Sequence, residues 1–175
     1  MTQKALLVID MLEDFVYEGG RLYIGDAAKK VLPEVKKAVE KAREEQIPVF
    51  FVCDNHREDD AEFEMFPCHC IQGTKGAQIA KELNPKPEDH IIYKRRFSAF
   101  FGTDLDLTLR ELGVKEIVLV GVCTNICVLY TAADARMLNY KVSVVKDAVA
   151  SFDKDAHEFA LKELKNTLGT EIIEQ

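Results

Sequence analysis

Residues 117–127 read Ile-Val-Leu-Val-Gly-Val-Cys-Thr-Asn-Ile-Cys, an aliphatic run that continues into a glycine and two cysteines. An aliphatic run without polar alternation is typical of a strand that is buried on both faces. The next stretch, Cys127–Leu138, is predicted to be a helix. A buried strand followed at once by a helix is the repeating unit of a parallel α/β sheet.

The same pattern recurs along the chain. Five more short apolar runs are predicted strands: Ala5–Ile9, Val49–Val52, His90–Tyr93, Val142–Val145 and Glu171–Ile173. The other predicted helices are Ala27–Glu45, Ala77–Leu83, Asp104–Leu112 and Lys154–Leu168. Alternating strands and helices predict right-handed crossovers and a three-layer αβα fold with a six-stranded parallel sheet. The length of 175 residues predicts a single domain spanning 1–175.

Charge and composition exclude several classes of partner. The chain carries 30 acidic and 23 basic residues, a net charge of −7, and its one short basic cluster is Lys94-Arg95-Arg96. Nucleic-acid binding normally needs a basic surface, so we expect none. The apolar runs are shorter than the ~18–20 residues of a membrane span, so no membrane association is expected. The N-terminal residues do not resemble a secretory signal, so the protein is expected to be cytoplasmic.

Three reactive side chains follow the ends of predicted strands. Asp10 follows the first strand, Lys94 the third, and Cys127 lies just after the fourth. Ligands of open α/β sheets bind beyond the carboxyl ends of the strands, so these groups should meet at one edge. Each residue alone also has an interpretation without catalysis. Asp10 could be a helix cap or a solvated strand end, Lys94 a surface lysine, and Cys127 a small buried side chain. Their coincidence favours catalysis.

The position of Cys127 suggests a nucleophile. Thr124 or Asn125 is a plausible N-cap, which puts Cys127 in the first helical turn, where the positive dipole end favours a thiolate. Lys94 should lower the pKa of this thiol further, and Asp10 can act as general base. Backbone N–H groups of the turn can hold an oxyanion.

These motifs resemble those of the isochorismatase-like cysteine hydrolases, and among them the nicotinamidases. The resembling stretches cover nearly the whole chain: residues 5–10 with Asp14-Phe15, residues 94–105, and residues 121–128. The resemblance implies strand order 3-2-1-4-5-6 and a triad of Asp10, Lys94 and Cys127. It also implies a cis peptide before Cys123, and an oxyanion hole formed by the N–H groups of Cys123 and Cys127. Three aromatic residues would line the substrate pocket: Phe15, Phe66 and Phe97.

The long connection after Val52 contains a second group of candidate residues. Asp54 and His56 are two residues apart and so share a face of an extended segment, and His69 follows in the same connection. The resemblance implies a metal site formed by these three residues and Glu62, with Glu64 as a competitor. Such ligands suit a divalent metal, with Zn²⁺ first and Mn²⁺ or Fe²⁺ as alternatives. Two other interpretations are a capping Asp with surface histidines, and a structural zinc site formed by Cys53, Cys68, Cys70 and a histidine.

The leading functional hypothesis is hydrolysis of nicotinamide to nicotinate and ammonia through a thioester on Cys127. Two departures from the nicotinamidase pattern concern the substrate: Asn125 replaces a usual Asp, and Phe97 replaces a common Tyr. The alternatives are a hydrolase for another small amide or carbamoyl compound, and a non-catalytic metal-binding scaffold. Isochorismate cleavage is disfavoured because those relatives do not need the cysteine. The expected partner is a small amide, and a homo-oligomer is possible because relatives are often dimers or larger.

Overall fold

The computed structural model describes residues 3–174, which contain one six-stranded parallel sheet. Its strand order is β3-β2-β1-β4-β5-β6, as predicted. The strands are β1 (Lys4–Ile9), β2 (Val49–Asp54), β3 (His90–Lys94), β4 (Glu116–Val122), β5 (Lys141–Ala150) and β6 (Glu171–Ile173). The order reverses between β1 and β4, so the ends of these two strands flank the position where such sheets bind ligands.

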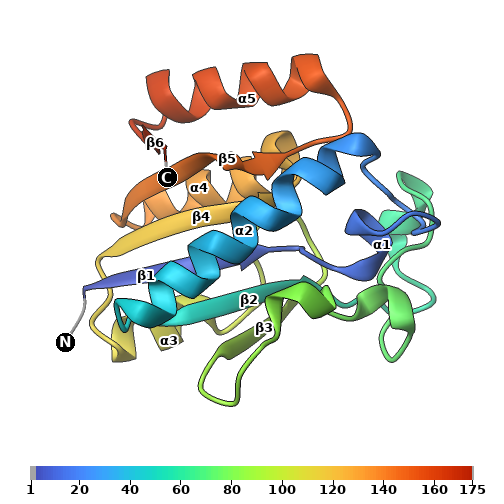
Figure 1. The fold of residues 1–175 in the computed structure, drawn as a ribbon, viewed down its shortest axis with the longest axis horizontal. Coiled ribbons are helices and arrows are strands. Elements are labelled where there is room, and N and C mark those ends of the chain that lie inside the picture. Colours follow the sequence, from blue (N-terminus) through green and yellow to red (C-terminus); the bar gives the residue numbers. More distant parts are fainter. Residues whose placement is uncertain (1–2, 175) are drawn as a thin grey trace.

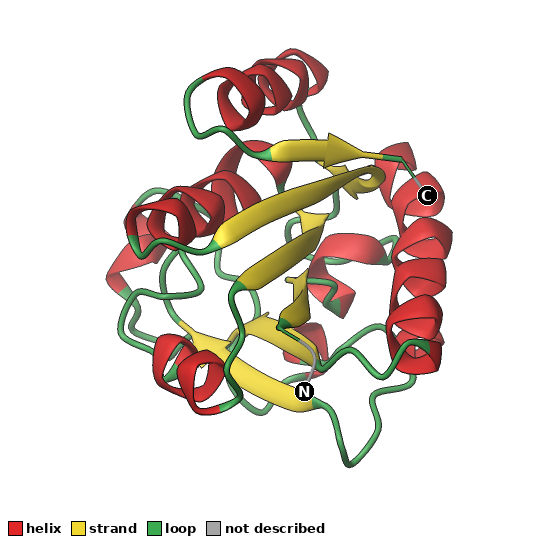
Figure 2. Cartoon of the chain, turned by 90° about the vertical axis from the view of Figure 1, so that its left-hand side faces the viewer, coloured by secondary structure: helices red, strands yellow, loops and turns green. Residues whose placement is uncertain are grey.

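Helices cover both faces of the sheet (Figure 1). They are α1 (Glu13–Val16), α2 (Asp26–Glu44), α3 (Leu105–Glu111), α4 (Leu129–Met137) and α5 (Lys154–Asn166). The helix α2 packs on one face of the sheet, and α3, α4 and α5 contribute buried residues to the core on the opposite face (Figure 2). Two apolar cores result, one on each face of the sheet. Among residues 3–174, no helix has both the length and the apolar character needed to cross a bilayer.

The helix α2 follows the predicted apolar spacing. Val31, Val35 and Val39 are each at most 1 % exposed and lie on the side that faces the sheet. Burying a side chain of this size stabilises the fold by roughly 1.5–3 kcal/mol. This helix thus anchors one face of the sheet by its apolar stripe.

The strand β3 differs from the prediction of a strand buried on both faces. It is an edge strand, and its residues alternate between exposed and buried, with Ile91 39 % and Tyr93 61 % exposed. The other side of the strand carries Ile92 and Lys94 into the protein. The alternation therefore directs Lys94 inward, at the carboxyl edge of the sheet.

The predicted helix over 77–83 is wrong. The segment forms two short 3₁₀ turns, Lys75–Ala77 and Lys81–Leu83, separated by residues that pair with another segment. Ile79 forms a β-bridge with Leu12, and the Ala80 N–H donates to the Met11 carbonyl oxygen. These backbone bonds replace the helical ones and attach the segment to the chain that follows β1.

Close contact between β1 and β4 depends on Gly121. This residue has φ +113° and pairs with Ile9, and a Cβ atom there would lie 2.0 Å from the Ile9 carbonyl oxygen. Only glycine fits such an approach, since it lacks the atom that would collide. The glycine therefore lets the two strands at the switch point stay paired up to their ends.

Candidate active site

The structure brings Asp10, Lys94 and Cys127 together at the carboxyl edge of the sheet. Lys94 Nζ lies 2.8 Å from Asp10 Oδ2 and 3.5 Å from Cys127 Sγ. Asp10 adopts φ +49°, a left-handed conformation that costs energy outside glycine and is common at functional sites. All three residues are buried, at 6 % exposure or less. The interpretation of Lys94 as a surface lysine is therefore wrong.

Buried charges determine the protonation of Asp10 and Lys94. Burial and the neighbouring Asp54 raise the pKa of Asp10 to about 6, so it remains ionised at neutral pH. Burial disfavours the charged form of Lys94, but Asp10 and Asp54 hold the pKa of this ammonium group well above its usual value. A carboxylate with a pKa near neutrality is well matched to accepting and returning a proton.

The expectation of a low pKa for Cys127 is wrong. Burial raises the pKa of the Cys127 thiol well above its usual value, and Asp10 and Asp54 add to this effect against Lys94. Burial is the main cause, and Lys94 does not offset it because this lysine already pairs with both carboxylates. The sulfur is therefore a neutral thiol at rest and has to lose its proton during attack.

The turn that carries Cys127 is a π-helical segment, Thr124–Val128, placed between β4 and α4. Neither Thr124 nor Asn125 caps it with a side chain, contrary to the prediction. Thr124 Oγ1 instead lies 2.8 Å from His157 Nδ1, and Ser151 Oγ donates to Asn125 Oδ1 over 2.6 Å. Ser151 and His157 were not among the predicted site residues, because both belong to segments distant in sequence from this turn.

The implied cis peptide before Cys123 is confirmed: the Val122–Cys123 bond is cis. The strand ends at Val122, and Cys123 lies at the start of the π-helical turn. The backbone of Cys123 and Cys127 thus belongs to the same short segment at the mouth of the site.

The four implied metal ligands also converge. His56 Nε2 lies 3.6 Å from Asp54 Oδ2 and 3.8 Å from Glu62 Oε1. His69 Nε2 lies 3.5 Å from Asp54 Oδ2 and 4.0 Å from Glu62 Oε1. Both histidines are buried, which contradicts their interpretation as surface residues.

The donor set fits a divalent cation. His56 Nε2 and Glu62 Oε2 are buried without a hydrogen-bond partner, which is costly unless another group binds there. Two imidazole nitrogens and two carboxylates suit Zn²⁺, and also Mn²⁺ or Fe²⁺. Glu64, the competing residue, is exposed.

The cysteines do not form a structural zinc site. Within residues 3–174, no cluster of three ligand-type side chains includes Cys53, Cys68 or Cys70. Cys70 instead contributes its backbone, since its N–H donates to Asp14 Oδ2 over 2.7 Å. Asp14 thereby fixes the chain next to His69 to the α1 segment.

Aromatic and aliphatic side chains enclose the space between Cys127 and the metal-ligand cluster. Phe15, Phe66 and Phe97 all line this cavity, and the Phe66 and Phe97 rings meet edge to face at 6.0 Å. Three further residues line the cavity and were not predicted from the sequence: Leu22, Ile126 and Phe152. The cavity has a volume of about 20 Å³, so its walls are close together.

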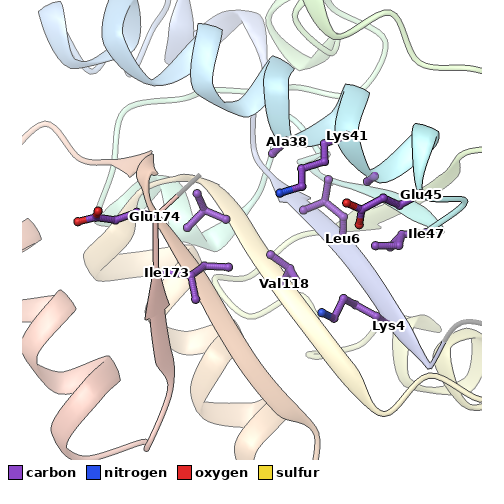
Figure 3. A pocket seen from close by; sticks show the side chains of 11 residues that line it. Lys4, Leu6, Ala38, Lys41, Glu45, Ile47, Val118, Ile173 and Glu174 are labelled. Carbon is purple, nitrogen blue, oxygen red and sulfur yellow. The ribbon is translucent and has the colours of Figure 1, made fainter.

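A second hollow lies away from these residues, between α2 and the sheet (Figure 3). It has a volume of about 130 Å³, an aliphatic floor that includes Leu6 and Val118, and charged residues at its rim. None of the predicted site residues lines it.

Comparison with known proteins agrees with this architecture. Residues 4–174 match the isochorismatase domain family, and the chain belongs to that family of hydrolases. It is similar to the crystal structure of nicotinamidase PncA from Bacillus subtilis, with a TM-score of 0.93 and 36 % identity over 99 % of this chain and 100 % of that one.

Other relatives differ in their described activity. Pyrazinamidase of Pyrococcus horikoshii, solved in complex with zinc, has a TM-score of 0.92 and 33 % identity, covering 99 % of this chain and 100 % of its own. N-carbamoylsarcosine amidase from Thermoplasma acidophilum has a TM-score of 0.90 and 34 % identity, covering 99 % and 96 %. A probable inactive nicotinamidase of Arabidopsis thaliana is 37 % identical over 93 % of this chain and 88 % of its own length.

Proposed function

We propose that this protein hydrolyses the carboxamide of nicotinamide, giving nicotinate and ammonia through a thioester on Cys127. The observation that carries the proposal is the position of Lys94 Nζ, 2.8 Å from Asp10 Oδ2 and 3.5 Å from Cys127 Sγ, beside the aromatic cavity. A nucleophile, a proton acceptor and a fixed positive charge are the parts that covalent amide hydrolysis requires.

The proton transfers of the first half-reaction follow from the protonation states of Asp10 and Cys127 before substrate binds. Cys127 Sγ forms a bond to the amide carbon while its proton passes to Asp10, whose pKa near 6 keeps it ionised at pH 7. The backbone N–H groups of Cys123 and Cys127 stabilise the negative charge on the amide oxygen. Asp10 then gives the proton to the amide nitrogen, the C–N bond breaks, and ammonia leaves.

The second half-reaction uses the same carboxylate. A water molecule attacks the thioester carbon and passes a proton to Asp10, the C–S bond breaks, and Cys127 takes that proton from Asp10. The carboxylic acid that is released loses its own proton to solvent and leaves as nicotinate. Lys94 stays protonated throughout, since two carboxylates contact it. Its role is to keep Asp10 oriented and to offset charge beside the sulfur.

The residues that would hold a divalent metal are Asp54, His56, Glu62 and His69. When bound, the metal supplies a Lewis-acidic point that can hold the ring nitrogen of a pyridine carboxamide opposite Cys127. Phe15, Phe66 and Phe97 would then enclose the ring, so the substrate is oriented at both ends.

The test is ammonia release from nicotinamide by wild type, Cys127→Ala and Cys123→Ala. We expect the first variant to lose at least about 10⁴-fold in rate, as when a nucleophile is removed from a catalytic triad. Cys123→Ala should keep activity because only its backbone is used. Equal activity of Cys127→Ala and wild type would show that Cys127 is not the nucleophile.

A second candidate is hydrolysis of another small amide, such as a carbamoyl compound. It is supported by the similarity to N-carbamoylsarcosine amidase and by Phe97 and Asn125, which depart from the nicotinamidase pattern. The same ammonia assay across nicotinamide and a set of aliphatic carbamoyl compounds separates the two. No turnover with any of them would favour the non-catalytic alternative, for which the Arabidopsis relative is a precedent.

A further inference from the structure

One buried carboxylate outside the predicted site contacts two of the four metal-ligand residues. The Asp60 side chain is 0 % exposed, and its Oδ2 lies 3.2 Å from Nδ1 of His56. Its Oδ1 accepts a hydrogen bond from the backbone N–H of Glu62 over 3.1 Å. A buried carboxylate needs compensating partners, so the other contacts of Asp60 matter.

Those partners are the two arginines of the basic cluster at 94–96. Arg95 Nε lies 2.8 Å from Asp60 Oδ2, and Arg96 Nη1 lies 2.9 Å from Asp60 Oδ1. The arginines are 47 % and 39 % exposed, so they cover Asp60 from the solvent side. The two half-exposed arginines therefore compensate the charge of a buried carboxylate.

The position of Asp60 determines which ring nitrogen of His56 donates a hydrogen bond. A carboxylate in ion pairs with two guanidinium groups accepts hydrogen bonds and donates none. His56 Nδ1 then carries a proton, so Nε2, which faces Asp54 and Glu62, is the nitrogen that can bind a metal. Histidine ligands of metals commonly have such a partner on the other ring nitrogen, which fixes the tautomer and the ring orientation.

We propose that Asp60, held by Arg95 and Arg96, is the positioning residue that sets His56 and Glu62 for metal binding. The inference rests on the metal site of the proposed function. The other histidine is held differently, because Nδ1 of His69 lies 2.8 Å from the backbone oxygen of Pro67. A substitution of the Asp60 side chain therefore tests how His56 is held and leaves the hydrogen-bond partner of His69 in place.

The experiment measures Zn²⁺ affinity directly, by competition between metal-stripped protein and a chromogenic chelator. Asp60→Asn should weaken Zn²⁺ binding by about 10–100-fold, the usual effect of removing such a partner. The matched control is Asp59→Asn, which removes the neighbouring carboxylate. Asp59 pairs with Arg57 on the exposed surface, 2.9 Å away, and should leave the Zn²⁺ dissociation constant unchanged.

A second readout is the visible absorption spectrum of the Co²⁺-loaded protein, which reports ligand geometry independently of turnover. We expect Asp60→Asn to change this spectrum and Asp59→Asn to preserve it. Identical Zn²⁺ affinities and Co²⁺ spectra for wild type and Asp60→Asn would overturn the proposal.

A second variant covers the case in which Asp60→Asn does not fold. The double change Arg95→Gln with Arg96→Gln keeps Asp60 but removes both ion pairs, and should also weaken Zn²⁺ binding, whereas Arg57→Gln should not. Unchanged affinity in the folded double variant would contradict the role of the arginines. Wild-type protein that binds no Zn²⁺, Mn²⁺ or Fe²⁺ but still releases ammonia would overturn this inference and leave the proposed hydrolysis intact.

Discussion

The proposed catalytic triad and the proposed metal-ligand cluster border one cavity, through Cys127 on one side and through Asp54, Glu62 and His69 on the other, but they are built in different ways. Asp10 follows β1 and Lys94 ends β3, so hydrogen-bonded strands fix their positions, and Cys127 lies on the π-helical turn that follows β4. Of the metal-ligand residues, only Asp54 lies on a strand, and the others belong to a connection with little regular structure. That connection is held by buried side chains, among them Asp14 and Asp60. Backbone pairing organises the first group, and single polar contacts organise the second.

Asp54 belongs to both groups. Its Oδ1 lies 2.5 Å from Lys94 Nζ, and its Oδ2 faces the two histidines. Burial opposes its charged form, but Lys94 and the histidines hold the pKa of Asp54 well below its usual value. The two regions are therefore in electrostatic contact although their architecture differs.

The largest expected effects are a loss of rate when the triad is changed and a loss of bound metal when the metal-ligand cluster is changed. Asp10→Asn should lower ammonia release by about 10²–10⁴-fold, since a general base is lost, while the protein retains its metal. His69→Ala should lose bound metal while Lys94 and Asp10 stay paired. Rate measurements and elemental analysis on the same preparations check both results. Loss of metal in Asp10→Asn would show that the two regions act as one unit.

The next largest effects are losses of folding stability when a glycine beside each region is replaced by alanine. Gly121→Ala should cost about 3 kcal/mol of unfolding free energy, because its Cβ would meet the Ile9 backbone, which cannot move aside. Gly76→Ala should cost about 1 kcal/mol, because its Cβ would meet the Asp14 carboxylate, a side chain that can shift. Urea unfolding of both variants measures the difference.

Gly76→Ala should also weaken Zn²⁺ binding, since a displaced Asp14 no longer holds the Cys70 backbone beside His69. Gly121→Ala that remains folded should not show this effect. The opposite ranking of the two stabilities would contradict the view that strand pairing is the more rigid of the two supports.

The smallest expected effect concerns the charge of Cys127 in the metal-free protein. A raised pKa means that the neutral thiol is present at pH 7 and that the reactive thiolate increases only as pH rises through the alkaline range. Alkylation of Cys127 by iodoacetamide, followed by mass spectrometry from pH 6 to 10, should therefore be slow at neutral pH. Asp54→Asn removes one nearby carboxylate and should move the profile to lower pH. A profile that is already complete at pH 6 would contradict this assignment.

The sequence was sufficient for the parts that follow from topology. Aliphatic runs predicted the six strands, and the rule for parallel sheets placed Asp10, Lys94 and Cys127 at one edge. The metal-ligand residues came from family resemblance, because spacing within an irregular segment does not define distances. Asp60, Ser151 and His157 were missed because a sequence does not show which polar side chains turn inward. The pKa of Cys127 was predicted in the wrong direction because desolvation depends on burial that only the structure shows.

The narrow cavity beside Cys127 restricts the entry of a substrate. A space of about 20 Å³ is close to the volume that one water molecule needs, so an aromatic ring enters only when the walls part. Phe152 is the most exposed of the aromatic wall residues, at 53 %. We expect displacement of this side chain to admit the aromatic ring of the substrate.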